Sequence, residues 1–168
     1  MAELTHKERL QPSLLDRLTD DDPTAKQESR NQRVLSGEKL RQSVQRDLSW
    51  LLNTTNLAAL QREVEAYPLV AESVLNYGLP DLAGHTTSGI NISALERHLR
   101  DAIQSFEPRL LKSTIKVKLT IDGDAMNNNA MTFVIEAFLW AQPTPLRLFL
   151  QTAIDLETGQ VEVNEMQG

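Results

Sequence analysis

The residues best suited to binding or chemistry lie at one corner of the sequence, Glu107-Pro108-Arg109. A helical pattern runs into this corner and an alternating, strand-like pattern runs out of it. Pro108 disfavours helical dihedral angles at Glu107 and lacks an amide donor, which explains why the helix stops. The two charges need a separate reason. A guanidinium suits carboxylates or carbonyls at an interface, and the spacing alone fits a solvated pair and a docking site equally well.

Glu136 is the one candidate for an acid catalyst, because it stands alone in the apolar run MTFVIEAFLWA. A glycosidase needs two carboxylates that flank one bond, one of them with a raised pKa. The sequence nominates no second carboxylate for Glu136. A single glutamate on a strand more often faces solvent or pairs with Arg or Lys across the ladder, and we favour that interpretation.

Other catalytic or metal-binding patterns fail on spacing. His6, His85 and His98 are scattered and lack the ligand arrangement of a zinc site. Asp122-Gly123-Asp124 opens like a calcium loop, but no glutamate completes it. Ser88 lies outside any nucleophile elbow, and no phosphate-binding glycine motif occurs. We therefore predict no catalytic residue, no metal and no cofactor.

Composition narrows the class of partner. The chain has 168 residues, 40% of them hydrophobic, a net charge of -6 and no cysteine. An acidic surface argues against nucleic-acid binding, so a protein partner or a small ligand is expected. No apolar run approaches the ~20 residues that span a bilayer, and the start lacks a secretory apolar region. These features predict a cytoplasmic protein without membrane insertion.

Two regions are expected along the chain. Residues 1–35 should form a short helix with Leu14, Leu15 and Leu18 on one side, followed by a flexible linker. Residues 36–168 should form a single domain.

The sequence pattern predicts helices in the first half of that domain. A helix capped by Ser36 should bury a stripe of leucines and valine, and a shorter helix should follow Pro68. Another helix should begin at Asn91 or Ser93, end near Phe106 and leave Glu96 in solvent. The stripes expected to be buried are Leu40, Val44, Leu48, Leu51 and Leu52, then Ile92, Leu95, Leu99, Ala102, Ile103 and Phe106.

The second half alternates with a period of two, which predicts strands near 114–121, 131–141, 146–155 and 160–164. The second of these is apolar on both faces and should be central or covered, whereas the last should be an edge. The expected fold is α+β, with N-terminal helices packed on one face of a mostly antiparallel sheet formed by the C-terminal half.

Several separated motifs resemble one protein family. LRQSVQRDLSWLLNT, SVLNYGLPDLAG, LERHLRDAIQSFEPRL and the strands after them are similar to the wedge proteins of contractile injection machines. With PSLLDRLTDDDP near the start, the resemblance is strongest to the TssE proteins of type VI secretion baseplates. It covers residues 10–163.

The resemblance implies a structural baseplate component. The family's Glu-Pro-Arg motif, here Glu107, Pro108 and Arg109, would dock on the wedge subunits TssF and TssG. The sheet would template the contractile sheath, TssB/TssC, by strand exchange, and the terminal QVEVN edge suits strand addition. We expect Glu107 and Arg109 to point outward, so that Arg109→Ala removes wedge binding with little effect on folding.

Two alternatives remain open at this stage. Some members of the family are lysozyme-related, which would make the chain a peptidoglycan hydrolase. An adaptor that uses its acidic linker and N-terminal helix as a tether is the other.

Overall fold

A computed structural model describes residues 13–19, 36–81, 83, 91–120, 130–141 and 144–166. The linker expected after residue 19, the loop at 84–89 and most of the long hairpin loop lie outside these ranges. So do His6, His85, Ser88 and the Asp122-Gly123-Asp124 run.

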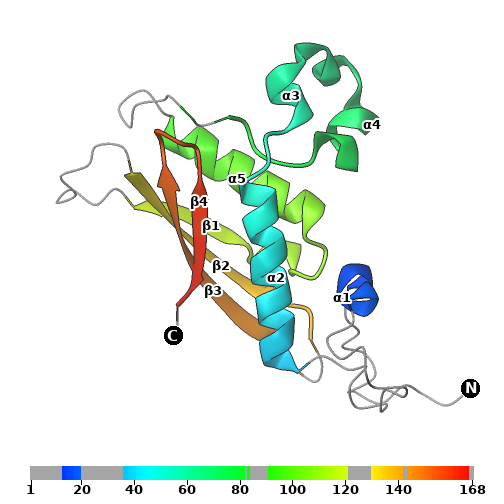
Figure 1. The fold of residues 1–168 in the computed structure, drawn as a ribbon, viewed down its shortest axis with the longest axis vertical. Coiled ribbons are helices and arrows are strands. Elements are labelled where there is room, and N and C mark those ends of the chain that lie inside the picture. The colour runs from blue at the N-terminus through cyan, green and yellow to red at the C-terminus, as the bar shows by residue number, and fades with distance from the viewer. Residues whose placement is uncertain are drawn as a thin grey trace, which may run out of the picture.

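Helices occupy the N-terminal half of the described chain and strands the C-terminal half (Figure 1). The helical elements, including short 3-10 turns labelled η, are α1 (Leu14–Leu18), α2 (Gly37–Leu52), α3 (Leu57–Leu60), η2 (Arg62–Ala66), α4 (Pro68–Ala71), η3 (Val74–Asn76), α5 (Ile92–Phe106) and η5 (Lys112–Thr114). The strands are β1 (Lys116–Thr120), β2 (Ala130–Leu139), β3 (Leu146–Asp155) and β4 (Val161–Glu165).

The four strands form one antiparallel sheet in the order β1-β2-β3-β4. Apolar side chains face each other across the ladder, since Val117 lies opposite Ile135 and Ile135 lies opposite Leu150. The predicted α+β fold is confirmed, and β4 is an edge strand as expected.

Both long helices begin at the kind of cap that the sequence offers. The Ser36 side chain accepts a hydrogen bond from the Lys39 amide at 3.1 Å, and Asn91 accepts one from the Ala94 amide at 3.0 Å. Asn91, not Ser93, is therefore the cap of α5. Each cap satisfies an amide that has no partner in the first turn.

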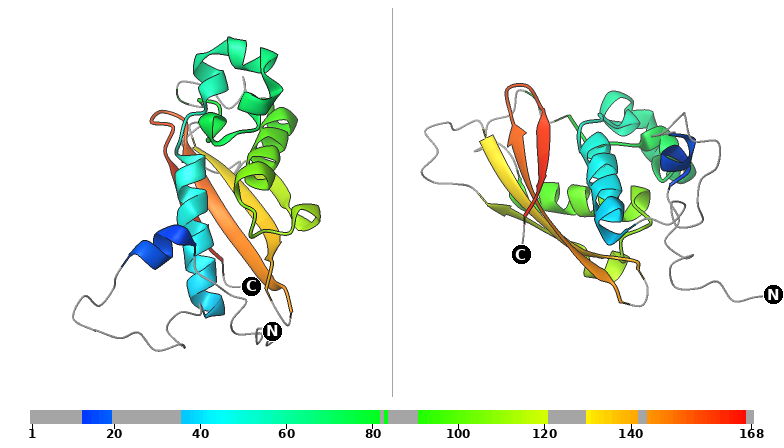
Figure 2. Two further views of the ribbon diagram at one scale, coloured as in Figure 1. Left: turned by 90° about the vertical axis from the view of Figure 1, so that its right-hand side faces the viewer. Right: turned by 60° about the horizontal axis from the view of Figure 1, so that its bottom comes forward.

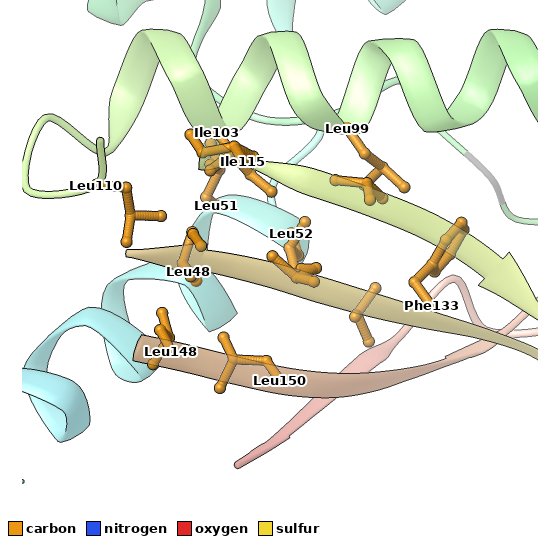
Figure 3. Packing of buried hydrophobic residues seen from close by; sticks show 14 of the residues in the cluster. Leu48, Leu51, Leu52, Leu99, Ile103, Leu110, Ile115, Phe133, Leu148 and Leu150 are labelled. Carbon is orange, nitrogen blue, oxygen red and sulfur yellow. The ribbon is translucent and has the colours of Figure 1, made fainter. Parts of the chain in front are cut away.

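The core lies between α2, α5 and one face of the sheet (Figure 3). Leu48 of α2 and Ile103 of α5 are fully buried there. Further members of the cluster are Leu40, Val44, Leu51, Leu52, Leu95, Leu99, Phe133, Ile135, Leu139, Leu148, Leu150 and Ile154. Burial of this apolar surface is the main stabilising contribution and fixes both helices relative to the strands.

The segment between α2 and α5 is more broken than the sequence suggested. The helix expected after Pro68 ends at Ala71, because Ser73 adopts an extended backbone and its hydroxyl accepts from the Leu75 amide at 3.2 Å. Gly78 then has φ +120, and a Cβ there would lie 2.2 Å from the Thr54 carbonyl oxygen. Only glycine permits this close approach.

The outer face of the sheet is not covered by the helices. β2 lies between β1 and β3 and is central, as predicted. Phe138 on the outer face of β2 is 41% exposed, and Trp140, just past the end of the strand, is 51% exposed.

Candidate functional site

The Glu-Pro-Arg corner joins the end of α5 to the end of β2. The Glu107 amide closes α5 by donating to the Ile103 carbonyl at 2.9 Å. The Arg109 carbonyl accepts from the Trp140 amide at 2.7 Å, and the Leu111 amide donates to the Phe138 carbonyl at 2.8 Å. The backbone of the corner is therefore held by the sheet and does not form a free loop.

The Glu107 carboxylate points into the protein, and its side chain is only 3% exposed. Arg109 closes on it: Nε donates to Oε1 at 2.7 Å, Nη2 donates to Oε2 at 2.5 Å, and the Arg109 amide donates to Oε1 at 3.0 Å. Such a fork of parallel bonds is the strong form of an ion pair. The expectation that both charges point outward is wrong for Glu107, because this local pairing draws its carboxylate under the corner.

Arg109 also reaches across to α2. Its Nη1 donates to the Ser43 hydroxyl at 3.0 Å and its Nη2 donates to Asp47 at 2.5 Å. Burial by itself lowers the pKa of this guanidinium, but Glu107 and Asp47 outweigh it and raise the pKa above the ordinary value. Arg109 thus stays charged at any working pH and keeps 23% of its side chain exposed.

The ionic contacts continue to the N-terminal helix, which lies beside α2 (Figure 2). Arg46 donates to Asp47 at 2.8 Å and to Asp16 of α1 at 2.6 Å. The Ser43 hydroxyl, which accepts from Arg109, donates to Asp16 at 2.7 Å. We call Glu107, Arg109, Asp47, Arg46 and Asp16 the corner network. Its charges alternate in sign from the corner to α1.

The neighbours of Asp16 stabilise the ionised form of its carboxyl group. Burial raises its pKa, but hydrogen bonds from Ser13, Ser43 and Arg46 outweigh this and leave the pKa well below the ordinary value. Ser13 also forms a capping box with Asp16, because each side chain bonds the other residue's backbone amide.

An apolar groove of about 530 Å³ borders the corner network. Its walls include Pro108, Trp50, Tyr77, Phe106 and Leu15. Trp50 is 50% exposed, and the rings of Tyr77 and Phe106 meet edge to face at 5.2 Å. Exposed aromatic surface beside a desolvated arginine is the composition of an interface hot spot.

Sequence reasoning found the corner but missed its partners on α2. Ser43, Arg46, Asp47 and Trp50 recur at spacings of three and four, which places them on one face of the helix. That polar and aromatic stripe was the available signal. The sequence does not reveal that it faces a corner 62 residues away from Asp47.

Glu136 is unsuited to acid catalysis. It lies on the outer face of β2 and accepts from Arg147 of β3 at 2.5 Å, which is the cross-strand pairing favoured above. The hydrogen bond from Arg147 lowers its pKa, and Lys116 and Lys118 lower it further. A general acid needs the opposite shift. Across the described residues, no cluster of three His, Asp or Glu side chains could hold a metal ion, and His98 is exposed on α5.

Comparison with protein families identifies the chain. The model of the family "Baseplate wedge protein gp25" matches residues 38–144, which include both long helices, the corner and the first two strands. The chain belongs to this family. No curated protein and no solved structure matches it. The wedge protein is thus a structural component of a phage-tail-like baseplate. None of its described helices is long and apolar enough to cross a bilayer.

Proposed function

We propose that this wedge protein is the TssE-type subunit of a type VI secretion baseplate. It docks on the wedge subunits TssF and TssG through the groove at the Glu-Pro-Arg corner, and it templates the TssB/TssC sheath through its sheet. The motifs of the sequence and the family match support the baseplate role. The proposed location is the cytoplasm, at the inner face of the cell envelope.

The observation that carries the docking proposal is the contrast between the two parts of the corner. Its charges are fixed by the corner network, whereas the groove beside it leaves apolar surface in solvent. Pro108 is exposed and Arg109 lines the groove, so these two residues would touch the partner. Glu107 would act by holding Arg109 in position. An interface of this form gains from apolar burial without reorganising its charges on binding.

The sheet supports the templating proposal. Antiparallel edges accept an added strand through main-chain hydrogen bonds, which require no particular side chain. β4 is the final strand of the sheet, and the Val163 amide points away from β3 because the neighbouring Glu162 and Asn164 face β3 in the ladder. Among the described groups, none accepts a hydrogen bond from this amide.

Two substitutions should separate docking from templating. Trp50→Ala removes half-exposed aromatic surface from the groove and should reduce capture of TssF and TssG at least about tenfold, as expected for a hot-spot residue. Val163→Pro deletes one outward donor of β4 without removing a ladder bond to β3, and should block sheath assembly. Each variant should retain the other activity in pull-down and sheath-polymerisation assays.

Leu69→Ala is the matched control, because Leu69 of α4 is 85% exposed and does not line the groove. It should leave both activities unchanged. Loss of both activities in either variant would contradict the division into two surfaces, and full wedge binding by Trp50→Ala would contradict the docking groove.

We propose further that the protein has no hydrolase activity. The support is the lowered pKa of Glu136 and its pairing with Arg147. Purified protein should release no fragments from peptidoglycan. Cleavage that disappears in Glu136→Gln would favour the lysozyme-like alternative.

A further inference from the structure

Both outer strands of the sheet are bonded by side chains of the helix that lies above them. At the β1 edge, the Glu96 carboxylate of α5 accepts from the Leu119 amide at 2.8 Å, so this residue is not left to solvent as the sequence suggested. At the β4 edge, the side-chain amides of Gln45, midway along α2, and Asn53, its C-cap residue, play the same role.

The register shows that these contacts use the edge that an added strand would need. The Asp155 amide donates to the Gln160 carbonyl, and the Met166 amide donates to the Phe149 carbonyl. Even-numbered residues of β4 therefore face β3, and backbone groups of Val161, Val163 and Glu165 point outward.

Asn53 occupies the outward position of Val161 as a peptide group would. Its Oδ1 accepts from the Val161 amide at 2.9 Å, and its Nδ2 donates to the Val161 carbonyl at 2.8 Å. One primary amide thus satisfies both the donor and the acceptor of an edge residue. Gln45 adds a third bond, from Nε2 to the Val163 carbonyl at 2.7 Å.

Three polar side chains of α2 and its C-cap contact β4 along its length, and the two elements lie side by side in Figure 1. We call Arg41, Gln45 and Asn53 the stripe. Arg41, Gln45 and Asn53 are separated by multiples of four residues and so lie on one flank of the helix. Arg41 lies nearest Glu165, with 3.8 Å from Nε to Oε1. At this distance Nε makes no hydrogen bond to Glu165, and among the described residues this buried Nε has no other hydrogen-bond acceptor. The stripe therefore ends in a donor that an incoming carbonyl could satisfy.

We propose that Asn53 and Gln45 form a clamp that closes the β4 edge in the free subunit and gives way to an incoming extended strand. This inference rests on the proposed templating function. The entering backbone would replace the clamp at Val161 and Val163 bond for bond, gain the unused Val163 donor and bring a carbonyl to Arg41. The apparent affinity for the incoming strand is then the intrinsic affinity multiplied by the fraction of time that the clamp is open.

The test uses the full chain with purified sheath subunits and compares wild type with Asn53→Ala and Asn53→Asp. Asn53→Asp keeps the acceptor for the Val161 amide and loses the donor to its carbonyl. Glu96→Ala is the matched control, because it removes a cap from the opposite edge. Amide hydrogen exchange reports whether the clamp is open, and sheath-subunit affinity reports whether opening matters.

Asn53→Ala should speed exchange at Val161 on the order of tenfold and tighten sheath binding by a similar factor, since net hydrogen-bond contributions are modest. Asn53→Asp should give smaller changes. Glu96→Ala should speed exchange at Leu119 only. Unchanged exchange at Val161, or faster exchange without tighter binding, would overturn the clamp. If no form of the chain binds sheath subunits, the templating function itself fails.

Discussion

At the scale of single residues, the charges of the corner are used within the fold. Glu107 is buried, and both its oxygens accept from Arg109. The two residues are separated only by Pro108, so the pair forms locally, and Asp47 and Ser43 then fix its orientation. Desolvated charges of this kind are costly when one partner is lost.

Arg109→Ala should therefore destabilise the protein by about 3 kcal/mol, because it leaves Glu107 buried without its counter-ion. This reverses the result expected for an outward-pointing pair. Adding Glu107→Gln removes the buried charge, so the double variant should lose less than the sum of the two single losses. Urea denaturation measures all three. Additive losses, or a single loss below about 0.5 kcal/mol, would mean that the pair is not coupled.

At the scale of elements, α1 depends on its contacts. A helix of five residues is too short to persist alone, and Leu14 and Leu18 are 70% and 74% exposed, so apolar burial holds it weakly. Its described polar anchor is Asp16, which bonds Ser43 and Arg46 of α2.

Asp16→Asn should release α1 from α2 without unfolding the domain. The Asp16 pKa is lower in the docked state, so docking is fully favoured above the ordinary carboxyl value of about 4 and is lost as pH falls below it. The protection factors of α1 amides, which compare observed exchange with the intrinsic rate at the same pH, should therefore be high at pH 5 and 7 and lower near pH 3, and low throughout in the variant. Glu38→Gln, an exposed acid on α2, should behave as wild type. Equal protection in Asp16→Asn and wild type would show that Asp16 does not anchor α1 to α2.

The long elements could be predicted from the sequence because period and burial coincide there. The apolar stripe of α2 is buried as predicted, whereas in α5 Leu95, Leu99 and Ile103 are buried and the other predicted members, Ile92, Ala102 and Phe106, are only half-buried. Contacts between polar side chains and distant backbone could not be predicted, as with Glu96 and Leu119 or Asn53 and Val161. Such contacts depend on which side of a helix lies over which edge strand of the sheet. The spacing of hydrophobic residues does not determine that arrangement. The inward turn of Glu107 was missed for a different reason, because it comes from local pairing with Arg109, and the sequence spacing fits a solvated pair equally well.

At the scale of the whole molecule, the described core cluster is formed by α2, α5, the sheet and connecting residues such as Leu79, Leu110 and Leu156, and it includes no described residue before Leu40. The domain division at residue 35 therefore remains a prediction with a direct test. A chain of residues 36–168 should fold cooperatively and melt within about 5 °C of the full chain, since α1 adds polar contacts at one face only. Calorimetry of both chains measures this. Loss of a cooperative transition would show that the N-terminal region belongs to the folding unit.

The side-chain caps on both outer strands bear on how a polymer could start. When two free copies collide edge to edge, part of the backbone groups at each edge are already hydrogen-bonded to side chains. Few new hydrogen bonds can then form to hold the two copies together. Under the proposed clamp, growth would begin only where an incoming strand displaces Asn53 and Gln45 from the β4 edge. A contractile tube seeded by such a subunit would begin at its baseplate and remain unstarted in free solution.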